Sequence, residues 1–231
     1  MIDNAEGAVT DKTLRRIVVT SGFAGALAFA VGGAWLQVAG LDAFDAGGGA
    51  IHKGVSEHRT SLLACYVLWN VAIMIQLVFS VTLSLLTFRS GHLFAAILGG
   101  LSATVLTALM FIGFVFLGSL AFRAPHLSPE TSLLLSDLFY LVLSVAGFPA
   151  AVVLAALSMP LFRARGLSRF ISLLGIASAA VHVEAAVALS RSGTWSPAGW
   201  GGYVGPTLLV AWMMGVSFLF LRSDVVTPSQ P

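Results

Sequence analysis

The stretch SRFISLLGIASAAVHVEAAVALSR, residues 168–191, indicates what kind of fold this chain adopts. Its apolar run, from about Phe170 to Ser190, is as long as the roughly 20 residues that a helix needs to cross the hydrocarbon core of a bilayer. His182 and Glu184 lie inside that run. Because an ionisable side chain within a membrane carries a high free-energy cost, each of these two residues is a candidate for function.

The rest of the chain shares this apolar character. Of its 231 residues, 58% are hydrophobic and only 10% are charged, and the mean hydropathy is +0.94. A soluble domain carries about 25% charged residues, so the composition predicts a polytopic membrane protein with the lipid bilayer as its partner. A net charge of only +2 gives no basis for nucleic-acid binding, and the single cysteine, Cys65, excludes an internal disulfide.

Six apolar runs predict an all-α bundle of six transmembrane helices. The expected spans are residues 17–40, 61–88, 93–122, 133–161, 170–190 and 206–221, with a kink at Pro149 in the fourth. Residues 1–16 are expected to form a polar N-terminal segment and residues 223–231 a C-terminal tail. Between them lies a membrane domain, residues 17–222, whose largest loop is 41–60.

The arginines and lysines predict the orientation of these spans. An arrangement with both termini inside places eight basic residues on the inner side and four on the outer side. The excess of basic residues on the cytoplasmic side of membrane proteins therefore favours cytoplasmic termini and a multi-pass protein of the cell membrane.

A short pattern occurs twice at a constant offset. The first copy is Arg89, Phe94, Leu98-Gly99 and Ser102-Ala103, and the second is Arg165, Phe170, Leu174-Gly175 and Ser178-Ala179. Either an internal duplication or chance matching of apolar sequence explains it. The basic turn that leads into a helix with a Leu-Gly pair resembles a turn common in an uncharacterised family of six-helix bacterial membrane proteins. This resemblance covers a small part of the chain and implies no activity.

Polar side chains concentrate in the outer half of the predicted bundle, where they form the candidate site. Two carboxylates, Asp137 and Glu184, are candidates for acid–base catalysis. Candidates for binding a substrate are Tyr66, Trp69, Asn70, Tyr140, His182, His58 and Arg59.

Helical periodicity assigns these side chains to faces, at about 100° per residue. In the second span, His58, Cys65, Trp69, Gln76 and Ser80 share one face, and in the fourth span Asp137, Tyr140 and Ser144 share another. In the fifth span, His182 aligns with Gly175 and Ser178, whereas Glu184 lies about 200° away. The two ionisable residues therefore do not form a pair on an undistorted helix, and one of them is expected to face the pocket.

Each candidate also has a structural interpretation. Glu184 is either a general acid or one half of an ion pair with Arg191 or Arg59. Asp137 is either a second carboxylate of the site or a charge that favours the N-terminal end of its helix. Trp69, Tyr66 and Tyr140 either line a pocket for an isoprenoid or other apolar substrate or anchor the helices at the interface.

Histidines raise the question of a cofactor. His182 and His58 would hold a haem across the second and fifth spans, but a lone helical histidine more often bonds to a neighbouring helix. His52, His58 and Glu57, with Asp42 and Asp45, match no spacing of metal ligands, so a solvated loop is the favoured interpretation. We therefore expect no cofactor and no metal.

Two classes of function agree with these observations. The first is an intramembrane enzyme, such as a cyclase or isomerase, that acts on a lipophilic substrate by acid–base chemistry. The second is a transporter, a permease subunit or a ligand sensor without enzymatic activity. The small residues Gly22, Ala26, Gly99, Gly100 and Ala103 are expected to form packing seams between helices in either case. The sequence indicates no oligomeric state.

Overall fold

The computed structural model describes residues 2–38, 46–162, 166–187 and 200–226, and these are almost entirely helical. The elements in chain order are α1 (Ile2–Val38), α2 (Gly48–Glu57), α3 (Arg59–Arg89), α4 (Leu93–Arg123), the 3-10 helix η1 (Ala124–His126), α5 (Pro129–Phe162), α6 (Leu167–Val187) and α7 (Trp200–Val226).

Six of these helices are long and apolar enough to cross a membrane, which confirms the predicted number of spans. The spanning segments are Asp11–Leu36, Arg59–Arg89, Leu93–His126, Pro129–Phe162, Leu167–Val187 and Val204–Arg222. Helices suit such sequences because an α-helix satisfies its backbone hydrogen bonds within the segment, where lipid offers no partner.

The structure shows helix in two segments outside the predicted spans. Helix α1 begins at Ile2, so the polar N-terminal segment continues the first span as one helix. The expected loop 41–60 contains α2, whose Ile51 and Val55 are buried. Helix α5 is one continuous helix that contains Pro149 and Pro160, and the kink at Pro149 stays a prediction.

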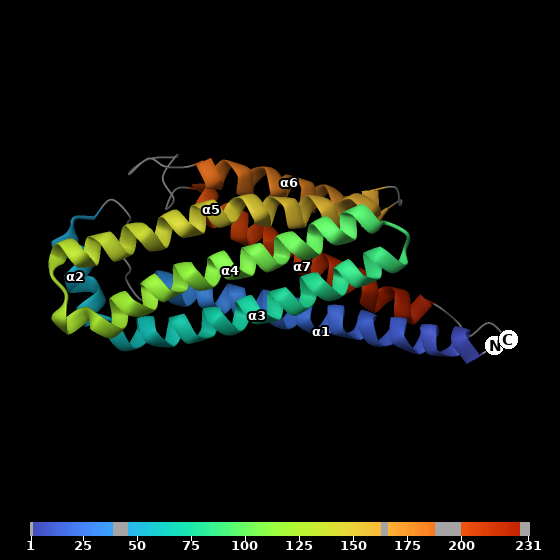
Figure 1. Cartoon of the computed structure of the whole chain (residues 1–231), viewed down its shortest axis with the longest axis horizontal. Coiled ribbons are helices and arrows are strands. Elements are labelled where there is room, and N and C mark those ends of the chain that lie inside the picture. Colours follow the sequence, from blue (N-terminus) through green and yellow to red (C-terminus); the bar gives the residue numbers. More distant parts are fainter. Residues whose placement is uncertain (1, 39–45, 163–165, 188–199, 227–231) are drawn as a thin grey trace.

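Helix α2 packs across one end of the bundle, the α2 end, opposite the end at which α1 begins and α7 finishes (Figure 1). Gly48 lies against α5, where a Cβ would come 2.5 Å from the Pro129 carbonyl oxygen. His52 Nδ1 lies 3.2 Å from Ser132 Oγ, also on α5. Arg59, at the start of α3, donates hydrogen bonds to the carbonyl oxygens of Ala121 and Phe122 at the end of α4. These contacts join α2 to α5, and the start of α3 to the end of α4, at the α2 end.

The six spanning helices form a closed ring. Each packs against the next in the order α1, α3, α4, α5, α6, α7, and α7 returns to pack against α1. An even number of spans brings the start of α1 and the end of α7 to the same end of the bundle (Figure 1). Ring closure therefore depends on a contact between the first and the last span.

Glycines allow several of these helices to approach closely. A Cβ on Gly22 of α1 would collide with Ser217 Oγ of α7, and a Cβ on Gly99 of α4 would come 2.6 Å from Leu157 Cδ2 of α5. Both glycines therefore lie at helix–helix contacts, as the sequence predicts for small residues in membrane bundles. Gly175 of α6 has the same role against Ser158 of α5.

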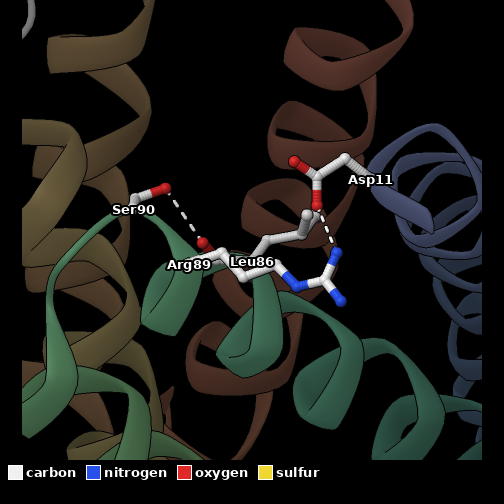
Figure 2. Close-up of polar contacts among 4 residues, drawn as sticks. All are labelled: Asp11, Leu86, Arg89 and Ser90. Atoms are coloured by element: carbon white, nitrogen blue, oxygen red, sulfur yellow. Dashed lines mark hydrogen bonds and ion pairs between the residues drawn. The ribbon is translucent and has the colours of Figure 1, made fainter. Parts of the chain in front are cut away.

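An ion pair ties α1 to the end of α3 away from α2. Figure 2 shows the Asp11 carboxylate against the guanidinium of Arg89, while the hydroxyl of Ser90 donates to the Leu86 carbonyl oxygen at 2.9 Å. Both partners of the ion pair are exposed. It holds the polar extension of α1 beside the turn between α3 and α4.

Candidate functional site

The ring surrounds a partly open cavity of about 460 Å³ that is lined by residues of all six spanning helices. Helices α1, α6 and α7 contribute residues from the parts nearest the α2 end, such as Gly33, His182 and Pro206. No carboxylate lines the cavity among the described residues. Its lining is mainly apolar, as is typical of a site for a small lipophilic molecule.

Five aromatic side chains form a continuous wall on one side of the cavity. Phe29 of α1 meets the edge of Trp69 of α3 with ring centroids 5.2 Å apart, and Trp69 stacks on Phe114 of α4 at 5.0 Å. Phe114 then meets Phe139 at 5.4 Å, and Phe139 meets Tyr140 at 5.1 Å, both on α5. These offset and edge contacts are the favourable geometries for aromatic pairs, and they make this wall rigid.

His182 is the polar feature on the α6 side. Its side chain is 8% exposed and lines the cavity. Its Nδ1 lies 2.8 Å from the Ser178 carbonyl oxygen, one turn earlier in the same helix. A carbonyl oxygen only accepts hydrogen bonds, so Nδ1 carries the proton and Nε2 of the neutral ring is an acceptor.

Glycines on two neighbouring helices allow these helices to approach His182 closely. A Cβ on Gly147 of α5 would come 2.5 Å from the His182 carbonyl oxygen, so α5 touches the backbone of α6 at this level. A Cβ on Gly205 of α7 would lie 3.4 Å from Cε1 and 3.5 Å from Nε2 of the imidazole. Helix α7 therefore lies beside the imidazole, while α5 contacts the backbone of α6 at the same residue.

The structure decides which ionisable residue of α6 meets the cavity. Gly175, Ser178 and His182 are all buried, in agreement with the face assigned to them from the sequence. Glu184 is half-buried and does not line the cavity, and its Oε2 is a buried oxygen without a hydrogen-bond partner in the described part of the chain. The proposed partner Arg59 bonds to α4 instead, and Arg191 lies outside the described residues.

Asp137 does not line the cavity either. It is half-buried in the third turn of α5 and takes part in an interaction of its own, while Tyr140 and Ser144 from the same predicted face line the cavity. The structure therefore does not bring the two carboxylates together around this cavity. Catalytic roles for Asp137 and Glu184 stay predictions from the sequence.

The residues that the sequence assigns to one face of α3 are buried from Cys65 onward. Cys65, Trp69, Gln76 and Ser80 are buried, and Trp69 and Gln76 line the cavity. His58, the first residue assigned to this face, is exposed at the junction of α2 and α3, because it ends α2 instead of continuing the helical face.

Two other candidates on α3 do not line the cavity. Tyr66 is half-buried and packs on α4, where a Cβ on Gly118 would lie 3.0 Å from its ring. Asn70 Nδ2 donates to the Tyr66 carbonyl oxygen at 2.7 Å. Substrate-binding roles for Tyr66, Asn70, His58 and Arg59 therefore rest on the sequence alone.

The two histidines considered for a haem do not both line the cavity. His58 does not line the cavity to which His182 contributes. Glu57 lies 3.9 Å from Lys53 on α2, and Asp42 and Asp45 are outside the described residues. Within the described part of the chain, no group of three or more His, Cys, Asp or Glu side chains is placed to hold a metal ion.

Sequence reasoning missed the contribution of α1 and α7 to the site. Ala30, Gly33 and Ala34 of α1 and Pro206 and Thr207 of α7 line the cavity. None is ionisable, so an inventory of ionisable groups passes over them. The signal was the adjacent pair Gly32-Gly33 within an otherwise bulkier run, which permits both a close contact and a recess.

Comparison of the chain with protein-family models, with curated proteins and with solved structures finds no match. The functional argument therefore starts from the cavity.

Proposed function

We propose that this chain is an integral membrane protein whose ring of six helices binds a lipophilic alcohol in its central cavity. The observation that carries the proposal is a cavity of about 460 Å³ with His182 on one side and an aromatic wall on another. Protein sites for small molecules measure about 300–1,000 Å³ and combine an apolar lining with a few placed polar groups.

The volume and the polar anchor define the class of ligand. At roughly 30 Å³ for each water-sized group, the cavity accommodates about fifteen non-hydrogen atoms. Because Nε2 of His182 accepts a hydrogen bond, the matching ligand group is a donor such as a hydroxyl. An isoprenoid alcohol such as farnesol has this size and this chemistry.

The arrangement of the ring in a membrane belongs to the same proposal. We place the end where α1 begins and α7 finishes on the cytoplasmic side of the cell membrane, because Lys12, Arg16, Arg89 and Arg222 lie at that end. Cysteines introduced at exposed Ser90 and at exposed Ser56 test it, since native Cys65 is buried. A membrane-impermeant maleimide added to intact cells should label the Ser56→Cys variant and leave Ser90→Cys unlabelled, and the reverse pattern would refute the orientation.

Binding is tested by photo-labelling in lipid nanodiscs. The probe is farnesol with a photoreactive diazirine, and unlabelled farnesol is the competitor. The Gly33→Leu variant should lose labelling by about tenfold or more, the change that 1.4 kcal/mol of binding free energy produces. A Cβ at Gly33 meets no described atom within 4 Å, and Gly33 lines the cavity, so the leucine side chain is expected to take up cavity volume.

Gly49→Leu is the matched control for this test. Gly49 is exposed on α2, and its Cβ would also meet no described atom within 4 Å. This variant should be labelled like the wild type. Wild-type labelling of a folded Gly33→Leu protein would refute the cavity as the binding site.

The role of His182 is tested by comparing farnesol with its methyl ether, which cannot donate a hydrogen bond. Farnesol should compete better against the wild-type protein by the free energy of one hydrogen bond, about 0.5–1.5 kcal/mol. In the His182→Leu variant the two compounds should compete equally. A preference for farnesol that survives this substitution would refute His182 as the anchor.

An acid–base enzyme is the second candidate. The observation that favours it is an Nε2 acceptor in an apolar cavity, on an imidazole held in position through Nδ1 by the Ser178 carbonyl oxygen. Gas chromatography of farnesol after incubation with wild-type and His182→Leu protein separates the two candidates. Conversion by the wild type alone supports an enzyme, and binding without conversion supports a transporter, permease subunit or sensor.

A further inference from the structure

We infer that the ligand enters this cavity sideways from the bilayer, through an opening between α1 and α7. This inference rests on the proposed function and adds the source of the ligand, which is the lipid phase instead of water. It follows from the exposure of the lining residues and from the shape of the contact between α1 and α7.

The exposed residues among those that line the cavity come from two helices, α1 and α7. Lining residues from α3, α4, α5 and α6 are all buried or half-buried. The exposed lining residues are Ala30 and Ala34 of α1 and Pro206 and Thr207 of α7. Among the described residues, the cavity therefore reaches the surface of the bundle where the first and last spans meet.

The contact between α1 and α7 is tight along one part and open along another. Ser217 Oγ of α7 donates to the Val18 carbonyl oxygen of α1 at 3.3 Å. A Cβ on Gly25 of α1 would come 2.9 Å from Met213 Cε of α7. About two turns further along α1, a Cβ on Gly33 meets no described atom within 4 Å. The two helices thus pack closely away from α2 and leave space beside Gly33.

The residues that line the opening belong to two segments that are long and apolar enough to span a membrane. Ala30 and Ala34 belong to the span Asp11–Leu36, and Pro206 and Thr207 belong to the span Val204–Arg222. The two alanines contribute only methyl groups to its lining. A lipophilic alcohol partitions into the bilayer, so this opening places the cavity in direct contact with the phase where the ligand is concentrated.

Exchange kinetics test the route. Wild-type protein in nanodiscs is loaded with tritiated farnesol, mixed with an excess of vesicles that contain unlabelled farnesol, and sampled for retained tritium. In Ala34→Trp, the indole should obstruct the opening and slow exchange by about tenfold or more. The rate is expressed as the fraction of the tritium bound at time zero, because Ala30 and Ala34 also line the cavity and a change in equilibrium occupancy must not enter the exchange rate. Ala30→Trp should act in the same way and replaces Ala34→Trp if that variant fails to fold.

Leu27→Trp is the matched control, because Leu27 lies on the same helix with 66% of its surface exposed and does not line the cavity. It should exchange at the wild-type rate. Wild-type exchange rates in a folded Ala34→Trp or Ala30→Trp protein would overturn the lateral route and indicate entry from water, while the loss of binding in Gly33→Leu would still support the cavity. A wild-type protein that retains no farnesol would overturn the binding site and the route together.

Discussion

Replacing Gly147 by alanine should destabilise the protein through a single added methyl group. Gly147 lies on α5, and the new Cβ would come 2.5 Å from the His182 carbonyl oxygen and 3.0 Å from the Ala186 Cβ, both on α6. A backbone oxygen cannot rotate away as a side chain does. The two helices must therefore separate along this contact or tolerate the overlap.

The magnitude follows from the cost of overpacking. One extra methyl group in a well-packed core costs about 1–3 kcal/mol. Replacing a glycine by alanine within a helix stabilises the helix by about 0.8–1.0 kcal/mol, because alanine has the higher helix propensity. The net expectation is a destabilisation of up to about 2 kcal/mol, with a displaced imidazole at the cavity wall and weaker binding of farnesol.

Thermal unfolding in detergent, followed by tryptophan fluorescence, measures this effect. Gly33→Ala is the matched control, because its Cβ meets no described atom within 4 Å and it retains the gain in helix propensity. For a chain of this size, about 1 kcal/mol corresponds to a change of about 2–4 °C in Tm. A Gly147→Ala protein as stable as Gly33→Ala would refute the close contact between α5 and α6.

The remaining predictions concern the ion pair at one end of the bundle and the buried hydroxyl groups. Arg89→Ala should lower the free energy of unfolding by less than about 1 kcal/mol, and this effect should disappear at high salt, since both Arg89 and Asp11 are exposed. Urea or SDS titration at two ionic strengths measures the effect. A salt-independent loss of several kcal/mol would contradict the prediction. Ser158→Ala should be neutral or stabilising by up to about 1 kcal/mol, because Ser158 Oγ is fully buried without a partner in the described part of the chain. Ser172→Ala is the matched comparison and should lower the free energy of unfolding by about 0.5–1.5 kcal/mol, since Ser172 Oγ donates to the Ser158 carbonyl oxygen at 2.8 Å. A larger loss of stability from Ser158→Ala than from Ser172→Ala would contradict the roles given to both hydroxyl groups.

The number of spans and the faces of single helices were accessible from the sequence. Hydropathy and length are local properties, so six apolar runs predicted six spanning helices. Helical periodicity is local as well, and it separated His182 from Glu184 before any neighbour was known. The same rule failed at His58, because a helix boundary between α2 and α3 interrupts the periodicity there.

Helix α2 shows the limit of local patterns. Its glycines and short length are typical of a loop, and it is held by contacts with α5, such as the approach of Gly48 to Pro129. A short helix with three adjacent glycines at its start has little stability of its own, so packing decides whether it forms. No local signal in residues 41–60 showed this packing.

The sequence by itself determined that this chain forms six apolar helices and that His182 and Glu184 point in different directions. The tertiary structure decided that α7 returns to α1, that the ring surrounds a cavity, and that His182 faces it while Asp137 and Glu184 do not line it. The reason is that a cavity is formed by side chains from segments far apart in the chain. Periodicity tells which residues share a face, but only the packing of the other five spans determines what that face meets.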